Sequence, residues 1–249
     1  MLILLSNDDG VGAPGLEALR REISRFAKVI VVAPEANQSA ASHSLTLQRP
    51  LRVRVVGPDV YAIDGTPTDA VTWAFHRLLI RRKPKLVISG INAGSNMGDD
   101  VTYSGTVAAA IEGTILGVPA IAASLAGENG GEYRPAARFV ARLARWVLQE
   151  GIPKYTLLNV NLPDRGKKPL RKFAITKLGK RTYRDIIYDK VDPRGKNYFW
   201  IAGEPTADLT DVETDLRAVA DGFISITPLK IDMTDYDLFH RLRSAKLKI

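Results

Sequence analysis

The feature that most constrains the fold is the alternation of short β-branched runs with helical patterns between residues 2 and 161. Residues 2–6 read as a buried strand and residues 28–33 as the next strand, with apolar residues at helical spacing between them. Such alternation is typical of βαβ units, in which helices cover a parallel sheet. We therefore predict an α/β fold: a Rossmann-like, mostly parallel sheet flanked by helices.

The alternation continues along the chain. The expected extended segments lie within residues 45–63, 85–89, 119–124 and 157–161, and the expected helices begin at the Thr66 cap, span 104–116 and span 134–150. Residues 90–103 are expected to form a loop between a strand and a helix. Residues 1–162 are interpreted as an α/β catalytic core that contains these elements.

The pattern changes after Pro163, where strand-like pieces replace the alternation. These pieces lie around residues 172–178, 184–188, 198–202 and 223–227, and a helix is expected from about Tyr236. Residues 163–249 are therefore interpreted as a smaller β-rich C-terminal lobe with a terminal helix. Such a short helix with one apolar stripe must pack against its own subunit or a neighbouring one.

Composition excludes several classes of protein. The 249 residues include no cysteine, which excludes disulfides, a thiol nucleophile and thiolate zinc sites. The sequence has no apolar run of about 18 residues, so we expect no membrane span. The apolar residues 2–5 have no basic flank and stop at Ser6, so we expect no signal peptide and a cytoplasmic protein.

The positive charge is concentrated in one region. The formal net charge is +8, and nine lysines and arginines lie between Arg165 and Arg184. This region is either a solvated basic edge or a surface that attracts anionic substrates. Nucleic-acid binding is a weaker third alternative, because only Phe173 and Tyr183 interleave with the charges and no binding motif accompanies them.

Three polar clusters follow predicted parallel strands. Asp8-Asp9 follows the first strand, Ser39 the second, and Asn92 and Asn96 the strand at 85–89. Because ligands of open α/β sheets bind at the carboxyl ends of the strands, we expect these side chains to form one site. Their hard oxygen ligands favour Mg²⁺ or Mn²⁺. For either aspartate alone a helix cap is the simpler interpretation, but the pair with Ser39 and Asn92 favours a metal.

A second group of residues indicates an anion site. Ser104-Gly105-Thr106 begins the small-residue helix at 104–116, and a helix N-terminus offers free N–H donors and positive dipole charge. An ordinary cap is the alternative. Since the loop that ends at this helix also holds Asn92 and Asn96, a metal ion and an anion site together predict phosphate chemistry.

A competing motif predicts another function. Residues 10–15 form a GxGxxG sequence after the first strand, and Glu35 ends the second strand, as in dinucleotide-binding oxidoreductases. A pyrophosphate in this loop would meet Asp8 and Asp9 directly, so we rank this alternative second.

Taken together, these motifs resemble the SurE survival-protein nucleotidases. The matching residues are 3–10 (ILLSNDDG), 33–34 (AP), 37–39 (NQS), 65–67 (GTP), 89–94 (SGINAG) and 103–110 (YSGTVAAA). The resemblance implies a divalent-metal-dependent phosphatase acting on nucleoside 5′- and 3′-monophosphates, with short polyphosphate as a further substrate. It also implies a homodimer or homotetramer assembled through the C-terminal part. From the residues of the basic region we expect no stable nucleic-acid complex.

The resemblance also implies residue roles. Asp8, Asp9, Ser39 and Asn92 correspond to metal ligands, and Asn96, Ser104, Gly105 and Thr106 to a phosphate cradle, with Asp8, Asp9 and Asn96 catalytic. Attack on phosphorus by an activated water and attack by an aspartate both remain open. His43 is a candidate acid for the leaving group, although a lone histidine is more often structural.

Overall fold

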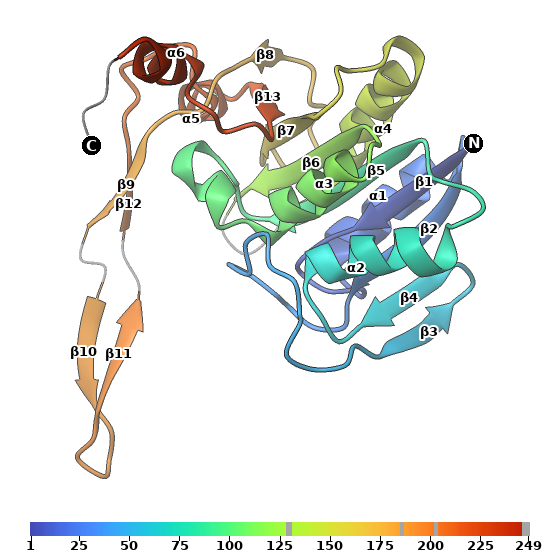
Figure 1. The fold of residues 1–249 in the computed structure, drawn as a ribbon, viewed down its shortest axis with the longest axis horizontal. Coiled ribbons are helices and arrows are strands. Elements are labelled where there is room, and N and C mark those ends of the chain that lie inside the picture. Colours follow the sequence, from blue (N-terminus) through green and yellow to red (C-terminus); the bar gives the residue numbers. More distant parts are fainter. Residues whose placement is uncertain (128–130, 185–186, 202–203, 246–249) are drawn as a thin grey trace.

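The computed structural model describes residues 1–127, 131–184, 187–201 and 204–245. In this part of the chain, the strands of the central sheet are β1 (Leu2–Ser6), β2 (Lys28–Pro34), β3 (Val53–Gly57), β4 (Val60–Ile63), β5 (Leu86–Ala93), β6 (Ala120–Ala126), β7 (Thr156–Pro163), β8 (Phe173–Ile175) and β13 (Ile224–Lys230). They lie in the order β3-β4-β2-β1-β5-β6-β7-β13-β8 (Figure 1). Among these described strands, β3–β4 and β7–β13 are the antiparallel neighbours. The mostly parallel sheet is therefore confirmed.

Helices cover both faces of this sheet, as predicted. Helix α1 (Pro14–Ile23) packs with α4 (Tyr133–Glu150) on one face, and α2 (Pro67–Trp73) packs with α3 (Gly105–Ile115) on the other. Strand β1 contributes Ile3 and Leu5 to the first core and Leu2 and Leu4 to the second. Since side chains alternate across a strand, both faces of β1 must be apolar, which explains its unbroken hydrophobic sequence.

The start of α2 shows how local sequence fixes an element. The Thr66 hydroxyl accepts a hydrogen bond from the Asp69 N–H at 3.1 Å, and the Asp69 carboxylate accepts one from the Thr66 N–H at 2.9 Å. Pro67 occupies the first helical position. This reciprocal capping box satisfies donors that the helix leaves open, and it confirms the predicted start of the helix.

Strand β5 is longer than predicted. We expected the strand to end at Ser89 and a loop to begin at Gly90, but β5 continues to Ala93. The register with β6 shifts between Ser89 and Asn92, so the strand resumes after a local irregularity. Asn92 therefore lies within the strand, and the short 3-10 helix η2 (Gly98–Thr102) occupies part of the expected loop.

Some strands of the C-terminal part lie in the main sheet, and the others form an arm. Strands β8 and β13 belong to the main sheet, so the sheet continues beyond residue 162 and the division there stays a prediction. Two antiparallel pairs, β9 (Arg181–Arg184) with β12 (Glu204–Ala207) and β10 (Ile187–Val191) with β11 (Asn197–Ile201), form an arm that projects from the sheet (Figure 1). The predicted pieces at 184–188 and 198–202 fall on this arm, except residues 185, 186 and 202, which lie outside the described residues.

Two C-terminal helices accompany these strands. Helix α5 (Asp215–Ala220) was not predicted, whereas α6 (Tyr236–Ser244) begins where we expected the terminal helix.

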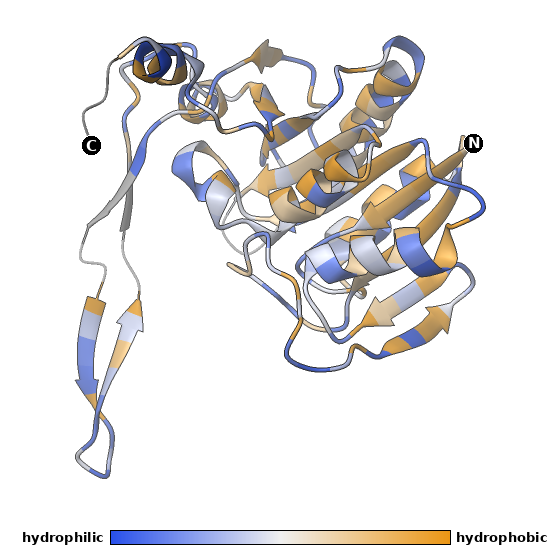
Figure 2. Cartoon of the chain, viewed as in Figure 1, coloured by the Kyte–Doolittle hydropathy of each residue, from blue (hydrophilic) through white to orange (hydrophobic). Residues whose placement is uncertain are grey.

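Figure 2 shows hydrophobic residues throughout the central strands and again along the arm. In the arm they are exposed, for example Trp200 at 64% and Ile201 at 83%. Among the described helices, none combines the length and hydropathy needed to cross a membrane.

Candidate functional site

The acidic pair lies where the sheet topology predicts a ligand site. Asp8 and Asp9 follow β1, which lies between β2 and β5 in the middle of the sheet. Asp8 is 4% exposed and Asp9 is half-buried. Both carboxylates therefore sit at the carboxyl edge of the parallel strands, where Asp8 has little access to bulk water and Asp9 is partly accessible.

The N-terminus of α3 contacts Asp8 directly. The Thr106 hydroxyl donates a hydrogen bond to Asp8 Oδ1, and Thr106 is completely buried. A Cβ atom on Gly105 would lie 2.8 Å from Asp8 Cβ, so only glycine allows this approach. The positive end of the helix thus faces the Asp8 carboxylate. The phosphate contact that we predicted for Thr106 stays a prediction, and in this structure its hydroxyl binds Asp8.

Two further loops meet the same pair. The Gln38 N–H donates to the Asp8 carbonyl at 2.8 Å, which brings the neighbouring Ser39 to this edge of the sheet. The Ala93 N–H donates to Asp9 Oδ2 at 3.1 Å, which brings the end of β5 and Asn92 to the same place. The loops after β1 and β2, the end of β5 and the start of α3 therefore converge on the acidic pair.

The environment opposes the negative charge of both carboxylates. Burial, together with the charge of the adjacent Asp9, raises the pKa of Asp8 from 3.8 to about 6 against the opposing hydrogen bonds from Thr106. Burial also raises the pKa of Asp9, opposed by the Ala93 N–H. In the described residues neither aspartate forms an ion pair with a lysine, arginine or histidine of the chain. The pair therefore favours an added positive charge.

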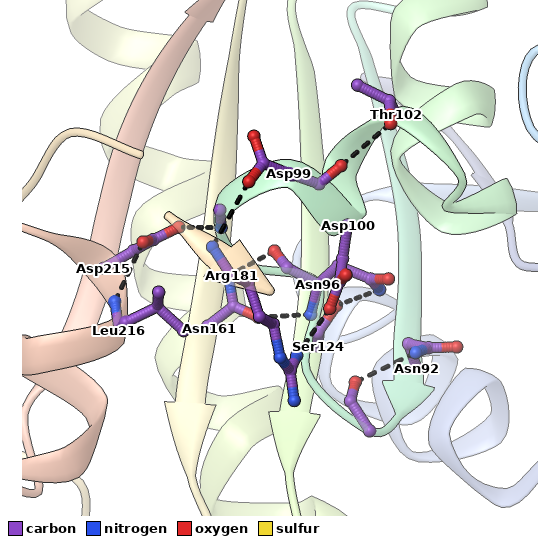
Figure 3. A network of polar contacts seen from close by, with 12 residues as sticks. Asn92, Asn96, Asp99, Asp100, Thr102, Ser124, Asn161, Arg181, Asp215 and Leu216 are labelled. Atoms are coloured by element: carbon purple, nitrogen blue, oxygen red, sulfur yellow. Dashed lines mark hydrogen bonds and ion pairs between the residues drawn. The ribbon is translucent and has the colours of Figure 1, made fainter. Parts of the chain in front are cut away.

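Asn96 lies in a separate network at the ends of the next strands (Figure 3). Its side-chain nitrogen donates to Ser124 Oγ at 2.8 Å, and its N–H donates to Asn161 Oδ1 at 2.8 Å. Its carbonyl accepts hydrogen bonds from Asn159 at 2.8 Å and from Asn161 at 2.9 Å. The backbone of Asn96 is thus fixed by β7 and its side chain by β6, whereas the contacts of Asp8 come from the loop after β2 and from α3.

The other predicted site residues have more local contacts. Ser104 is the N-cap of α3 and accepts a hydrogen bond from the Val107 N–H at 3.1 Å. Asn92 donates to the Gly94 carbonyl at 2.9 Å. Ser39 is exposed, and its N–H donates to Asn37 Oδ1 at 2.7 Å.

His43 anchors the loop that follows Ser39. Its Nε2 atom lies 2.9 Å from Glu112 on α3, and Thr72 on α2 donates to the other carboxylate oxygen at 2.9 Å. Burial favours the neutral form of Glu112, but the hydrogen bonds from His43 and Thr72 outweigh it and lower the pKa of Glu112. The candidate leaving-group acid therefore has a structural partner on a neighbouring helix.

Sequence reasoning missed the residues that hold Asn96. Ser124, Asn159 and Asn161 are all fully buried, within the otherwise apolar strands β6 and β7. Polar residues in such strands are a usable signal, because buried polar groups require partners. Tyr133, at the start of α4, was also missed: burial raises its pKa, and the charges of Asp9 and Asp164 raise it further.

The available ligands fit a hard cation better than a transition metal. Among the described residues, no three His, Cys, Asp or Glu side chains gather closely enough to bind a metal ion. A cation at the acidic pair would therefore combine two carboxylates with hydroxyl or amide oxygens and water. Such mixed oxygen coordination is typical of Mg²⁺.

Comparison with known proteins decides the family. The family model for survival protein SurE matches residues 3–185, which is more than half of the chain. The chain belongs to the SurE family. This confirms the resemblance seen in the motifs, most of which lie at the convergence of loops described above.

Individual SurE proteins match almost the whole chain. The 5′-nucleotidase SurE of Geotalea uraniireducens is 52% identical over 245 residues, covering 98% of both chains. The 5′-nucleotidase SurE of Citrifermentans bemidjiense is 52% identical over 251 residues, covering 99% of this chain and all of the relative. The crystal structure of the SurE protein from Aquifex aeolicus has a TM-score of 0.87 at 41% identity and covers 98% of both chains.

Proposed function

We propose that this SurE-family protein is a divalent-metal-dependent nucleotidase. It hydrolyses nucleoside 5′- and 3′-monophosphates to nucleoside and phosphate, with short polyphosphate as a further substrate. The observation that carries the proposal is the buried Asp8-Asp9 pair, whose charge no cationic side chain of the described residues offsets. The nucleotidase names of the two relatives support the substrate class.

The proposed metal ligands are Asp8, Asp9, Ser39 and Asn92. Backbone contacts bring the segments of these residues to one edge of the sheet. A bound Mg²⁺ or Mn²⁺ supplies Lewis-acid polarisation of the phosphoryl oxygens and an activated water. The chain itself orients the carboxylates, because Thr106 holds Asp8 and the Ala93 N–H holds Asp9.

The proposed phosphate site comprises Asn96, Ser104, Gly105 and Thr106. At the start of α3, the Gly105 N–H and the Ser104 hydroxyl proton are the donors that we assign to phosphate oxygens, and the helix dipole favours the same charge. Thr106 contributes through Asp8. We assign attack on phosphorus to water, because both carboxylates are needed as ligands. An aspartyl-phosphate intermediate, trapped in acid-quenched reactions, would overturn that assignment.

Phosphate release from a panel of nucleotides tests the function. Nucleoside 5′-monophosphates, 3′-monophosphates and tripolyphosphate are each incubated with Mg²⁺, Mn²⁺ or a chelator. We expect hydrolysis of the monophosphates with either metal and none with the chelator. Hydrolysis that persists unchanged in the chelator would refute the metal site, and no hydrolysis of any nucleotide would refute the nucleotidase.

Two binding assays separate the alternative functions. An oxidoreductase should bind NAD(P) without metal, yet the Glu35 carboxylate that would hold a ribose lies 2.7 Å from the Arg54 guanidinium. A nucleic-acid-binding protein should show steeply salt-dependent affinity for long DNA or RNA.

We also propose that the protein is a homodimer or homotetramer assembled through its C-terminal part. Helix α6 has no buried residue, and its apolar side chains Tyr236, Leu238, Phe239 and Leu242 are all exposed. An isolated two-stranded hairpin such as β10–β11 is marginal in water. Both surfaces would be stabilised if a second copy covered them.

A further inference from the structure

The segment between β5 and α3, residues 94–104, links the two halves of the proposed site. It follows Asn92, contains Asn96 and ends at Ser104, the cap of α3. We call it the linking segment. Asn96 is held by β6 and β7, as described above, whereas the η2 helix farther along is held by side chains that come from the C-terminal part of the chain.

Asp215, at the start of α5, binds the linking segment at the first residue of η2. Its Oδ2 atom accepts a hydrogen bond from the Gly98 N–H at 2.9 Å, and its Oδ1 atom accepts one from the Gly179 N–H at 2.8 Å. Asp215 is completely buried. Gly98 has a φ of +54°, and a Cβ there would lie 2.8 Å from the Gly179 carbonyl oxygen. The backbone at Gly98 therefore lies close to the backbone at Gly179, and the Asp215 carboxylate binds both.

Arg181 makes a second connection beside the first. Its guanidinium lies 2.5 Å from the Asp100 carboxylate, with side-chain exposures of 18% and 14%. Its N–H donates to Asp99 Oδ2 at 3.2 Å. Figure 3 shows Arg181 beside η2, with Asp99 and Asp100 on one side and Asp215 close by. A pair with so little solvent around it is screened far less than a surface ion pair.

We propose that Arg181 and Asp215 are positioning residues that hold the linking segment in its catalytic geometry. The proposal rests on the proposed function, since it assigns Asn96 and Ser104 to the phosphate. The residues that they bind, Gly98 and Asp100, lie between Asn96 and Ser104 along the chain. Loss of the anchors would therefore let the segment that joins Asn96 to Ser104 shift while Asp8 and Asp9 stay in place. A displacement of about 1 Å at a reacting group can lower a rate on the order of 100-fold.

Arg181 also connects the linking segment to the arm. Arg181 is the first residue of β9, and β9 pairs with β12 at the base of the arm. The strand that begins the arm therefore also anchors the linking segment. Contacts that move the arm at its base would be transmitted to the proposed phosphate site.

The test compares Arg181→Ala with a matched control, Arg217→Ala. Arg217 also forms an arginine–aspartate pair in the C-terminal part, with Asp221 at 2.8 Å, and its contacts lie within residues 209–221. With Mg²⁺ and a nucleoside monophosphate, we expect Arg181→Ala to lower kcat about 10- to 100-fold with a smaller change in KM. Arg217→Ala should leave both close to the parent values.

A charge exchange separates positioning from general damage to the fold. The double variant Asp100→Arg with Arg181→Asp should recover part of the kcat that either single change loses. Asp215→Asn, which removes one acceptor oxygen, should act in the same direction as Arg181→Ala. Equal losses in Arg181→Ala and Arg217→Ala, or no recovery in a folded double variant, would overturn the proposal.

Hydrogen exchange tests the anchors without any reference to activity. Amide exchange in peptides covering residues 94–104 should accelerate in Arg181→Ala and stay unchanged in Arg217→Ala. If the parent protein releases no phosphate, the proposed nucleotidase fails, and the exchange rates still decide whether the anchors exist. Unchanged exchange in Arg181→Ala would disprove the anchoring even in an active enzyme.

Discussion

Replacing Asp8 by asparagine should make the metal-free protein more stable while abolishing hydrolysis. The reason is that Asp8 is 4% exposed and lies beside a second carboxylate, and no cationic side chain in the described part of the chain pairs with it. Burial and the charge of Asp9 raise its pKa from 3.8 to about 6. Asparagine has nearly the same shape and can still accept the hydrogen bond from Thr106, but it carries no charge.

The pKa gives the size and the pH dependence of the effect. At about 1.4 kcal/mol per pKa unit, the difference corresponds to about 3 kcal/mol of unfolding free energy. Below pH 3.8 Asp8 is protonated in both the folded and unfolded states and costs nothing. As the pH rises to about 6 the unfolded chain ionises more readily, so the folded state loses stability, and the full cost applies above that pH. The variant should therefore gain most at neutral pH and little in acid.

Denaturant unfolding at several pH values, with a chelator or with Mg²⁺, measures this gain. In the chelator at neutral pH, Asp8→Asn should unfold at a higher denaturant concentration than the parent. Added Mg²⁺ should stabilise the parent and leave the variant unchanged, because binding to the folded state raises stability. A variant that is less stable than the parent in the chelator at neutral pH would refute the electrostatic argument.

Asp69→Asn is the matched control. Asp69 is also a buried aspartate, 3% exposed, but its two oxygens accept hydrogen bonds from the N–H groups of Thr46 and Thr66, both at 2.9 Å. An asparagine there loses one acceptor, so we expect a loss of about 1 to 3 kcal/mol. The same substitution should thus have opposite signs at the two positions.

Three further predictions follow from individual contacts. Thr106→Val removes the hydroxyl that stabilises ionised Asp8, so the pKa of Asp8 should rise and the acidic limb of the pH–rate profile should move to higher pH; an unmoved limb would exclude this role. His43→Ala and Glu112→Ala should lower activity to a similar extent, and the double variant should add little, if His43 acts as an anchor through Glu112; a much larger loss in His43→Ala would instead support direct acid catalysis. Deleting residues 235–249 should lower the oligomeric mass in light scattering and reduce activity indirectly, and an unchanged mass would refute assembly through α6.

The sequence predicts the core of the fold because its local signals agree. The strand at residues 2–6, the capping box at Thr66 and the small-residue helix after Ser104 appear within a residue or two of their expected positions. Each element carries both a hydrophobic pattern and a boundary signal. The same agreement predicts that the polar clusters meet, because parallel strands align their carboxyl ends.

The sequence does not predict contacts between residues that are far apart in the chain and meet only in the folded protein. Thr106 reads as a phosphate donor because it starts a helix, and only the distance between α3 and β1 reveals that its hydroxyl meets Asp8. Asp215 and Arg181 lie in a region without periodicity, so nothing in the sequence pairs them with Gly98 or Asp100. Helix α5 is too short to show a helical pattern, since its six residues span less than two turns.

The metal ligands and the phosphate cradle of the proposed site offset different charges. Two carboxylates and one divalent cation cancel, and a phosphate dianion would then add an uncompensated negative charge. The N-terminus of α3, which lies against Asp8, supplies roughly half a positive charge at this point. Because Thr106 on this helix also holds Asp8, the helix that favours the anion orients a carboxylate of the metal site. Moving α3 should therefore weaken metal and phosphate binding together, whereas neutralising Asp8 should weaken metal binding first.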